Sequence, residues 1–129
     1  MKFHKFRRDT RAHTAIEFAI TAPAFFALTF SIVQFGELGW TQLGLKHAVD
    51  LAARCASLNA ISCGTPSTTQ AYAVSVARPL TTAASTFTVS QLGCGQSVSV
   101  SYNYPIKIPF VTTMEVPIRA SSCFPIYKS

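Results

Sequence analysis

One acidic side chain, Glu17, stands at the start of an apolar stretch that follows a basic N-terminal tail. Burying a carboxylate near the middle of a bilayer costs about 2.5 to 3.5 kcal/mol, so a carboxylate in that position usually pairs with a cation or relays a proton. The alternative is that Glu17 lies at the headgroup level and caps the apolar helix, since Arg11 and His13 are close in sequence. The chemistry that Glu17 predicts is therefore ion pairing in or beside a membrane.

Four cysteines are the other reactive groups, and all of them follow the apolar stretch: Cys55, Cys63, Cys94 and Cys123. We expect this part of the chain to be exported to an oxidising compartment, where disulfides form. A zinc site is the competing interpretation, but there is no C-x-x-C pair. Of the three possible connectivities we favour Cys55 with Cys63 and Cys94 with Cys123, because an antiparallel last strand would end beside Cys94.

The sequence contains no recognisable catalytic constellation. It lacks a G-x-S-x-G nucleophile motif, an H-E-x-x-H zinc motif and a phosphate-binding glycine loop. Outside the membrane region only Asp50 and Glu115 could serve as catalytic carboxylates, and His47 is the only histidine there. We therefore expect no enzyme activity, no catalytic, metal-binding or cofactor-binding residues and no cofactor; a membrane-anchored enzyme is the least favoured class.

The stretch that positions Glu17 is long enough to cross a bilayer. Residues 18–35 read FAITAPAFFALTFSIVQF and carry no formal charge. A helix of this length spans about 27 Å, close to the hydrocarbon thickness of a membrane. A buried core helix is the alternative, but the rest of a 129-residue chain could hardly cover a helix that is apolar on every side.

The flanking charges predict the orientation of this span. Residues 1–12 hold five basic residues and one acidic residue, and positive charge stays in the cytoplasm. Without them the formal charge falls from +6 to +2, so the basic excess is a topology signal rather than a nucleic-acid surface. A cleaved secretion signal has a similar layout, but this apolar run is longer than usual and no convincing cleavage site follows it. We expect a cytoplasmic leader at 1–12, a retained transmembrane helix at 13–37 and an exported domain at 38–129.

The exported part changes from a helical period to a period of two. A helix is expected over 38–60, because one stripe is apolar: Leu45, Ala48, Leu51, Ala52, Cys55 and Leu58. A short helix is expected at 70–78, and strands at about 86–92, 96–104 and 116–124. The expected fold is α+β, with a long N-terminal transmembrane helix that continues as an amphipathic helix and packs on a three-stranded antiparallel sheet. Trp40 is expected at the membrane interface.

The stretch RAHTAIEFAITAPAFFALTFSIVQFGELGW resembles the N-terminus of TadE-like proteins, the minor pilins or pseudopilins of the tight-adherence branch of type IV pilus systems. In that family a basic leader ends at a small residue, a glutamate follows at the fifth mature position, and a proline and an aromatic-glycine pair lie further along the span. The matching positions here are Ala12, Glu17, Phe18, Ala19, Pro23, Phe35 and Gly36. The segments HAVDLAARCASL, VSVSYNYPIKIPF and IRAS also resemble the family's downstream pattern.

The resemblance implies a structural protein of pilus biogenesis or adhesion in a bacterial inner membrane, with a periplasmic C-terminal domain, or in an extracellular pilus. It implies cleavage between Ala12 and His13 by a prepilin peptidase, although family leaders usually end in glycine. It also implies that Glu17, Phe18 and Pro23 serve subunit assembly, with Glu17 paired to the α-ammonium group of a neighbour.

The implied partners are other pilin or pseudopilin subunits, the prepilin peptidase, the inner-membrane pilus assembly platform and membrane lipid, but not nucleic acid. The alternative is an uncleaved single-pass membrane protein whose disulfide-bonded exported domain binds another envelope component. The mass of the intact protein distinguishes the two.

Overall fold

The computed structural model describes residues 10–77, 80–107 and 113–126, with side chains from residue 13 onward. The chain divides into two compact units, Met1–Gly36 and Glu37–Ser129; we refer to them as the N-terminal unit and the C-terminal unit. Residues 1–9 lie outside the described residues, so the cytoplasmic leader stays a prediction.

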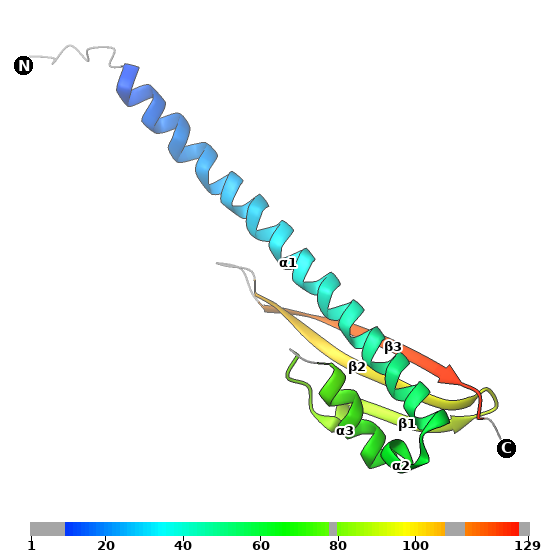
Figure 1. Cartoon of the computed structure of the whole chain (residues 1–129). Helices are drawn as coiled ribbons and strands as arrows, with labels where there is room; N and C mark the ends of the chain where they lie inside the picture. The colour runs from blue at the N-terminus through cyan, green and yellow to red at the C-terminus, as the bar shows by residue number, and fades with distance from the viewer. Residues whose placement is uncertain (1–9, 78–79, 108–112, 127–129) are drawn as a thin grey trace, which may run out of the picture. The chain divides into compact units, whose positions relative to one another are not determined.

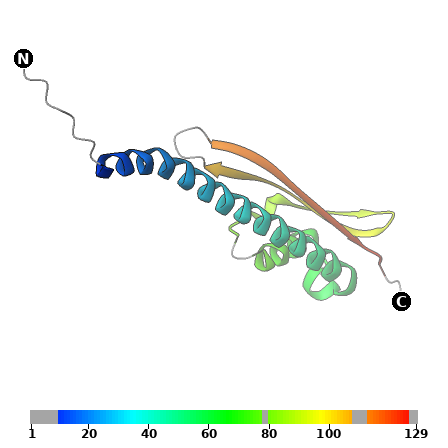
Figure 2. The same cartoon turned by 90° about the horizontal axis from the view of Figure 1, so that it is seen from above.

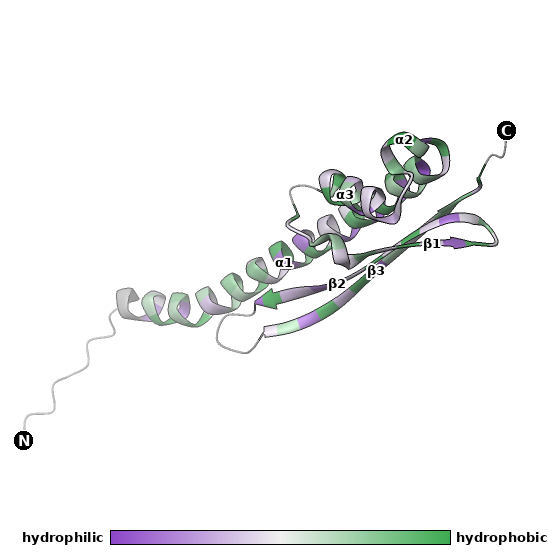
Figure 3. Ribbon diagram, turned by 90° about the horizontal axis from the view of Figure 1, so that it is seen from below, coloured by the Kyte–Doolittle hydropathy of each residue, from purple (hydrophilic) through white to green (hydrophobic). Residues whose placement is uncertain are grey.

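The helix α1, Thr10–Leu58, begins in the N-terminal unit and ends in the C-terminal unit (Figure 1). It is the one helix in the described part of the chain that is long and apolar enough to cross a membrane, judged by length and composition. Hydrophobic residues dominate its first half (Figure 3). The helix continues through Pro23, which has no N–H group to donate to the carbonyl oxygen of Ala19.

Hydroxyl groups within the apolar run are paired inside the helix. The hydroxyls of Thr21, Thr29 and Ser31 donate to the carbonyl oxygens of Glu17, Phe25 and Ala27, at 2.9, 2.9 and 2.8 Å. A polar group without a partner is costly in hydrocarbon, so these internal hydrogen bonds make the hydroxyls tolerable there. The polar residues of the run are thus compatible with a membrane span.

The C-terminal unit contains the end of α1 and all the remaining elements. They are α2 (Ala60–Cys63), α3 (Pro66–Val76), the short 3₁₀ helix η1 (Ala84–Thr86) and the strands β1 (Phe87–Leu92), β2 (Gly95–Lys107) and β3 (Thr113–Phe124). The strands form an antiparallel sheet in the order β1-β2-β3 (Figures 1 and 2). The predicted α+β fold, a long apolar helix and a three-stranded antiparallel sheet, is confirmed.

The helix expected at 70–78 begins four residues earlier, at Pro66. Thr65 caps it: its hydroxyl accepts from the backbone N–H of Thr68, and the Thr68 hydroxyl accepts from the N–H of Thr65. Pro66 occupies the first helical position, where a missing N–H costs nothing. The polar residues before Ala71 therefore form a capping motif and the first turn of α3.

The second and third strands are longer than expected from 96–104 and 116–124, and the prolines within them fit the ladder. Pro105 is opposite Glu115, and Pro117 is opposite Asn103. In an antiparallel pair every second residue directs its N–H away from the partner strand. Both prolines belong to that set, since neither can donate to the ladder. The pairing of β2 with β3 therefore continues to Lys107 and Thr113.

The core lies where the helices meet the sheet. Its buried apolar members are Leu45, Ala48, Val49, Ala52, Ala53, Ala73, Ala77, Phe87, Val98, Val100 and Ile118. The helices contribute mainly alanine, whose small side chain lets the helix backbones approach the sheet closely. Phe87 is the largest of the fully buried side chains. The buried stripe of α1 differs from the expected one: Val49 and Ala53 are fully buried, whereas Leu58 is 62% exposed.

Candidate functional site

Glu17 lies in the N-terminal unit beside His13, one helical turn earlier. The distance between His13 Nε2 and Glu17 Oε1 is 3.5 Å, and the two side chains are 78% and 65% exposed. This spacing of four residues is the one that places side chains next to each other on a helix. When the imidazole is protonated, the two groups form an ion pair within the chain.

This contact adds a residue to the predicted pairing chemistry. The family resemblance assigns the partner of Glu17 to another subunit, and the sequence places His13 near Glu17 and at the predicted cleavage point without pairing the two side chains. The i,i+4 spacing was the signal that could have identified His13 as a partner in the same chain. After cleavage, His13 would carry both an imidazole and the new α-ammonium group. One turn of α1 would then hold a carboxylate, an imidazole and an ammonium group.

The other two predicted assembly residues are also exposed but lie on different sides of α1. Phe18 is 72% exposed, and Pro23 is exposed as well. At about 100° of rotation per residue, Phe18 and Pro23 point about 140° apart around the helix axis. The structure therefore does not gather Glu17, Phe18 and Pro23 into one patch; it places them around the helix.

The predicted processing point lies in the first turn of α1, because this helix begins at Thr10 and the bond in question joins Ala12 to His13. The Ala12 side chain lies outside the described residues. The first turn of a helix has N–H groups without partners in the helix and frays easily. A peptidase that binds its substrate in an extended conformation would therefore need to unwind only this first turn.

In the C-terminal unit a hydrogen bond joins β2 to α1 directly after the apolar run. The hydroxyl of Tyr104 donates to Glu37 Oε2 at 3.2 Å. Burial, the hydrogen bond to Glu37 and the negative charge of Glu37 together raise the pKa of Tyr104 above its usual value of 10.0. No sequence pattern predicts this contact, because the two residues are 67 positions apart.

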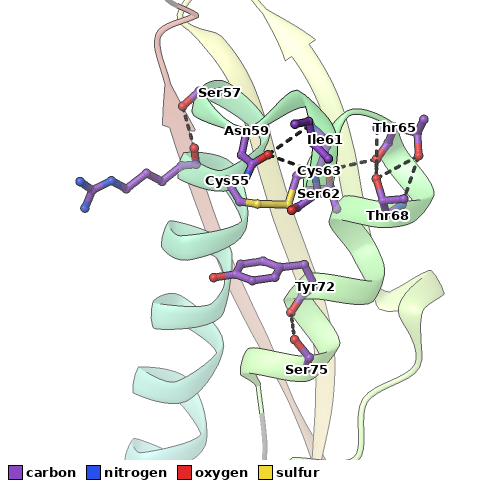
Figure 4. The surroundings of a disulfide bond; sticks show 12 residues. Cys55, Ser57, Asn59, Ile61, Ser62, Cys63, Thr65, Thr68, Tyr72 and Ser75 are labelled. Atoms are coloured by element: carbon purple, nitrogen blue, oxygen red, sulfur yellow. Dashed lines mark hydrogen bonds between the residues drawn. A yellow bond between two sulfur atoms is a disulfide. The ribbon is translucent and has the colours of Figure 1, made fainter.

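The cysteines pair as the sequence favoured, Cys55 with Cys63 and Cys94 with Cys123. The first disulfide joins α1 to α2 across the cap formed by Asn59, whose side-chain oxygen accepts from the N–H groups of Ile61 and Ser62 (Figure 4). The second joins the β1–β2 turn to the end of β3. Both disulfides therefore cross-link elements within the C-terminal unit.

Comparison with known families gives one match. Residues 14–54 match the family model described as TadE-like protein. The match contains Glu17, Phe18 and Pro23, begins after Ala12 and His13, and ends before Cys55 and the sheet. Neither the search of curated proteins nor that of solved structures found a match. The predicted resemblance is confirmed for this segment: residues 14–54, which make up most of α1, are TadE-like.

Proposed function

We propose that this protein is a structural subunit of a tight-adherence pilus system, a minor pilin or pseudopilin that α1 anchors in the bacterial inner membrane. The TadE-like match supports the association with that system. The function then is to pack α1 against other helices, in the membrane or in a filament, while the C-terminal unit lies on the periplasmic side.

The observation that carries this proposal is the uncovered apolar surface of the N-terminal unit. Its large apolar side chains are each more than half exposed: Ile16, Phe18, Ile20, Phe25, Phe26, Leu28, Phe30, Ile32, Val33 and Phe35. A contiguous apolar surface of this kind marks contact with a membrane or with another protein. Lipid or neighbouring helices must therefore cover the segment, and subunits of a pilus system meet both.

Glu17 determines which neighbours α1 can pack against and in which register. In lipid an unpaired carboxylate is costly, whereas a hydrogen-bonded pair with a cation of a neighbour offsets much of that cost and fixes the axial register of the two helices. His13 serves as a partner within the chain before assembly. Processing after Ala12 would create an α-ammonium group, which would pair with Glu17 of a neighbouring subunit in place of His13 or together with it.

Substitution of Glu17 tests the proposal. In cells that carry the remaining pilus components, we expect Glu17→Gln to insert into the membrane normally but to be incorporated poorly into pili or the assembly machine, as measured by crosslinking to other subunits and by counting pili. Glu115→Gln, which removes an exposed carboxylate of β3, is the matched control and should behave like the unchanged protein. Normal incorporation and piliation with Glu17→Gln would refute the role of this residue.

The single-pass alternative makes a different prediction about mass. The protein purified from membranes should lack residues 1–12 if a prepilin peptidase processes it. A full-length mass, together with unchanged piliation after deletion of the gene, would favour an uncleaved membrane protein with an envelope partner.

A further inference from the structure

Within the C-terminal unit, α1 has a side that faces away from the core. Its buried side carries Thr41, Leu45, Ala48, Val49, Ala52 and Ala53. At about 100° of rotation per residue, another set lies within an arc of about 80°, centred about 130° from the buried side: Gly39, Leu43, Lys46, Asp50 and Arg54. Leu43 is 68% exposed, Lys46 and Arg54 are exposed, and Gly39 and Asp50 are half-buried. We call this set the outer face of α1.

Three side chains of the outer face alternate in charge at steps of four residues, in the order Lys46, Asp50, Arg54. Opposite charges at this spacing can pair within one helix. In the part of the chain that the structure describes, none of the three belongs to an ion pair, whereas His13 and Glu17 form one. The alternating charges can therefore serve contact with another molecule.

A second, parallel copy of α1 complements this face when it is displaced by four residues, about 6 Å along the axis. Asp50 of one copy then faces Lys46 of the other, and Arg54 faces Asp50. Without displacement each of the three charges would face its own like, which is repulsive. A displacement of eight residues would place Arg54 opposite Lys46, again with like charges together.

The uncharged members of the outer face fit the same displacement. Leu43 of one copy would face Gly39 of the other, four residues earlier. A Cβ at Gly39 would meet nothing within 4 Å, so the fold of its own chain gives no reason for a glycine, which weakens a helix. Glycine does allow a large side chain of a second helix to approach the backbone closely.

The N-terminal unit specifies the same displacement through different residues. Glu17 paired with the α-ammonium group of His13 in a neighbouring copy, as proposed above, also joins positions that are four residues apart. Each unit gives the displacement from its own side chains, so the agreement does not depend on how the two units are arranged.

We propose that two copies of this chain pack in parallel through the outer face of α1, displaced by four residues, and that Lys46, Asp50 and Arg54 select this register. The inference rests on the proposed function, because a shared membrane or filament holds copies parallel and at high local concentration. Exposed ion pairs add little affinity. Their effect here is to disfavour the registers that bring like charges together.

Zero-length cross-linking with a carbodiimide tests the inference, because it forms an amide between the Asp50 carboxyl group and Lys46 Nζ only where the two groups meet. Protein purified from membranes, unlabelled or labelled with nitrogen-15, is mixed in equal amounts in vesicles of phosphatidylcholine and phosphatidylglycerol. A linked peptide of mixed isotope joins two copies, whereas a link within one chain carries a single isotope. Lys107 with Glu115, an exposed amine and carboxylate of the same unit outside the outer face, is the matched control.

We expect mixed-isotope Asp50–Lys46 peptides at about tenfold the yield of mixed Lys107–Glu115 peptides. Gly39→Leu should lower that yield about fivefold by filling the space for Leu43, without lowering the melting temperature, because a Cβ at position 39 is unopposed within its own chain. Arg54→Glu leaves both linked groups in place and should lower the yield about threefold, since it would face Asp50 of the other copy.

Three results would overturn the inference: Asp50–Lys46 peptides of a single isotope only, mixed peptides no more abundant than the control, or a mixed yield that Gly39→Leu leaves unchanged. The pairing of Glu17 is judged separately in the same sample. In processed protein the reagent also joins the α-amino group of His13 to Glu17. Mixed His13–Glu17 peptides would leave that part of the proposed function standing, and their absence would remove it as well.

Discussion

At the scale of single residues, two side-chain contacts define the candidate site, Glu17 with His13 and Tyr104 with Glu37. Only the first of them is visible in the sequence. Glu17 and His13 are close in sequence, and the four-residue spacing is visible to a reader who looks for it. Tyr104 and Glu37 are joined only because the sheet folds back along α1. Local chemistry was therefore predictable, whereas chemistry that depends on the tertiary fold was not.

Removal of the Tyr104 hydroxyl should weaken the C-terminal unit in a pH-dependent way. Its pKa is raised in the folded protein, so the bond stabilises fully below about pH 10 and is lost as the pH rises through the folded pKa. We expect Tyr104→Phe to lower the free energy of unfolding by about 0.5 to 1 kcal/mol at pH 7. The difference from the unchanged protein should vanish at pH above that pKa, as measured by urea unfolding at both pH values. A difference that does not change with pH would show that packing alone is responsible.

Gly95 should be far less replaceable than its neighbour Gly93 in the same turn. Gly95 has a φ of 127°, and a Cβ there would collide with the carbonyl oxygen of Phe124 and with Pro125. A Cβ on Gly93 would meet nothing within 4 Å. We expect Gly95→Ala to destabilise the unit by about 2 kcal/mol or more, and Gly93→Ala by less than about 0.5 kcal/mol. Thermal unfolding followed by circular dichroism compares the two, and equal melting temperatures would contradict the role of the turn.

At the scale of elements, the sequence predicted which segments are helices and strands better than where they end. The two-residue alternation predicted the strands, but β2 continues past its expected end at 104 to Lys107. Pro105 and Pro117 are in fact compatible with the ladder, because the register turns their nitrogen atoms away from the partner strand. Register is a property of the paired strands, so it could not be read from either strand alone. For the same reason the exact buried stripe of α1, with Val49 and Ala53, depended on the position of the sheet.

The two disulfides should differ in their resistance to reduction. Cys94 is exposed in the β1–β2 turn, whereas Cys63 is only 3% exposed. Access to the sulfur limits thiol exchange, so low dithiothreitol should reduce Cys94–Cys123 first. Loop-closure entropy predicts that this step costs about 3.7 kcal/mol of stability, against about 2.5 kcal/mol for the shorter loop of Cys55–Cys63. Alkylation and peptide mass spectrometry give the order, and earlier loss of Cys55–Cys63 would contradict it.

At the scale of the whole molecule, the division into two units follows from the distribution of apolar residues. The C-terminal unit buries its own core of helix and sheet residues, while the apolar side chains of the N-terminal unit remain exposed. The sequence predicted this division, because the charge-free run 18–35 indicates a membrane span and the two-residue alternation after it indicates the strands of a folded domain. The sequence of one chain could not predict which of these exposed residues would meet a neighbouring helix in the proposed assembly.

The C-terminal unit should therefore fold without the span. We expect residues 37–129, expressed with export to an oxidising compartment, to be soluble and to unfold in one cooperative transition, because the core and both disulfides lie within them. Phe87→Ala in this fragment should lower the free energy of unfolding by about 3 to 5 kcal/mol, since Phe87 is fully buried. Calorimetry measures both; a fragment without a cooperative transition would show that the span supports the fold.

The prolines of β2 and β3 have a consequence for copies that crowd together. Within the described residues, β2 has no neighbouring strand on the β1 side beyond Val100, and β3 has none on its outer side. Pro105 removes one backbone N–H donor from the free edge of β2, and Pro117 removes one from the free edge of β3. On β1, the side-chain amide of Gln70 donates to the carbonyl oxygen of Phe87 at 2.7 Å. Prolines on free strand edges disfavour pairing between the sheets of two copies, so under the proposed function the apolar surface of the N-terminal unit is the surface that remains for ordered polymerisation.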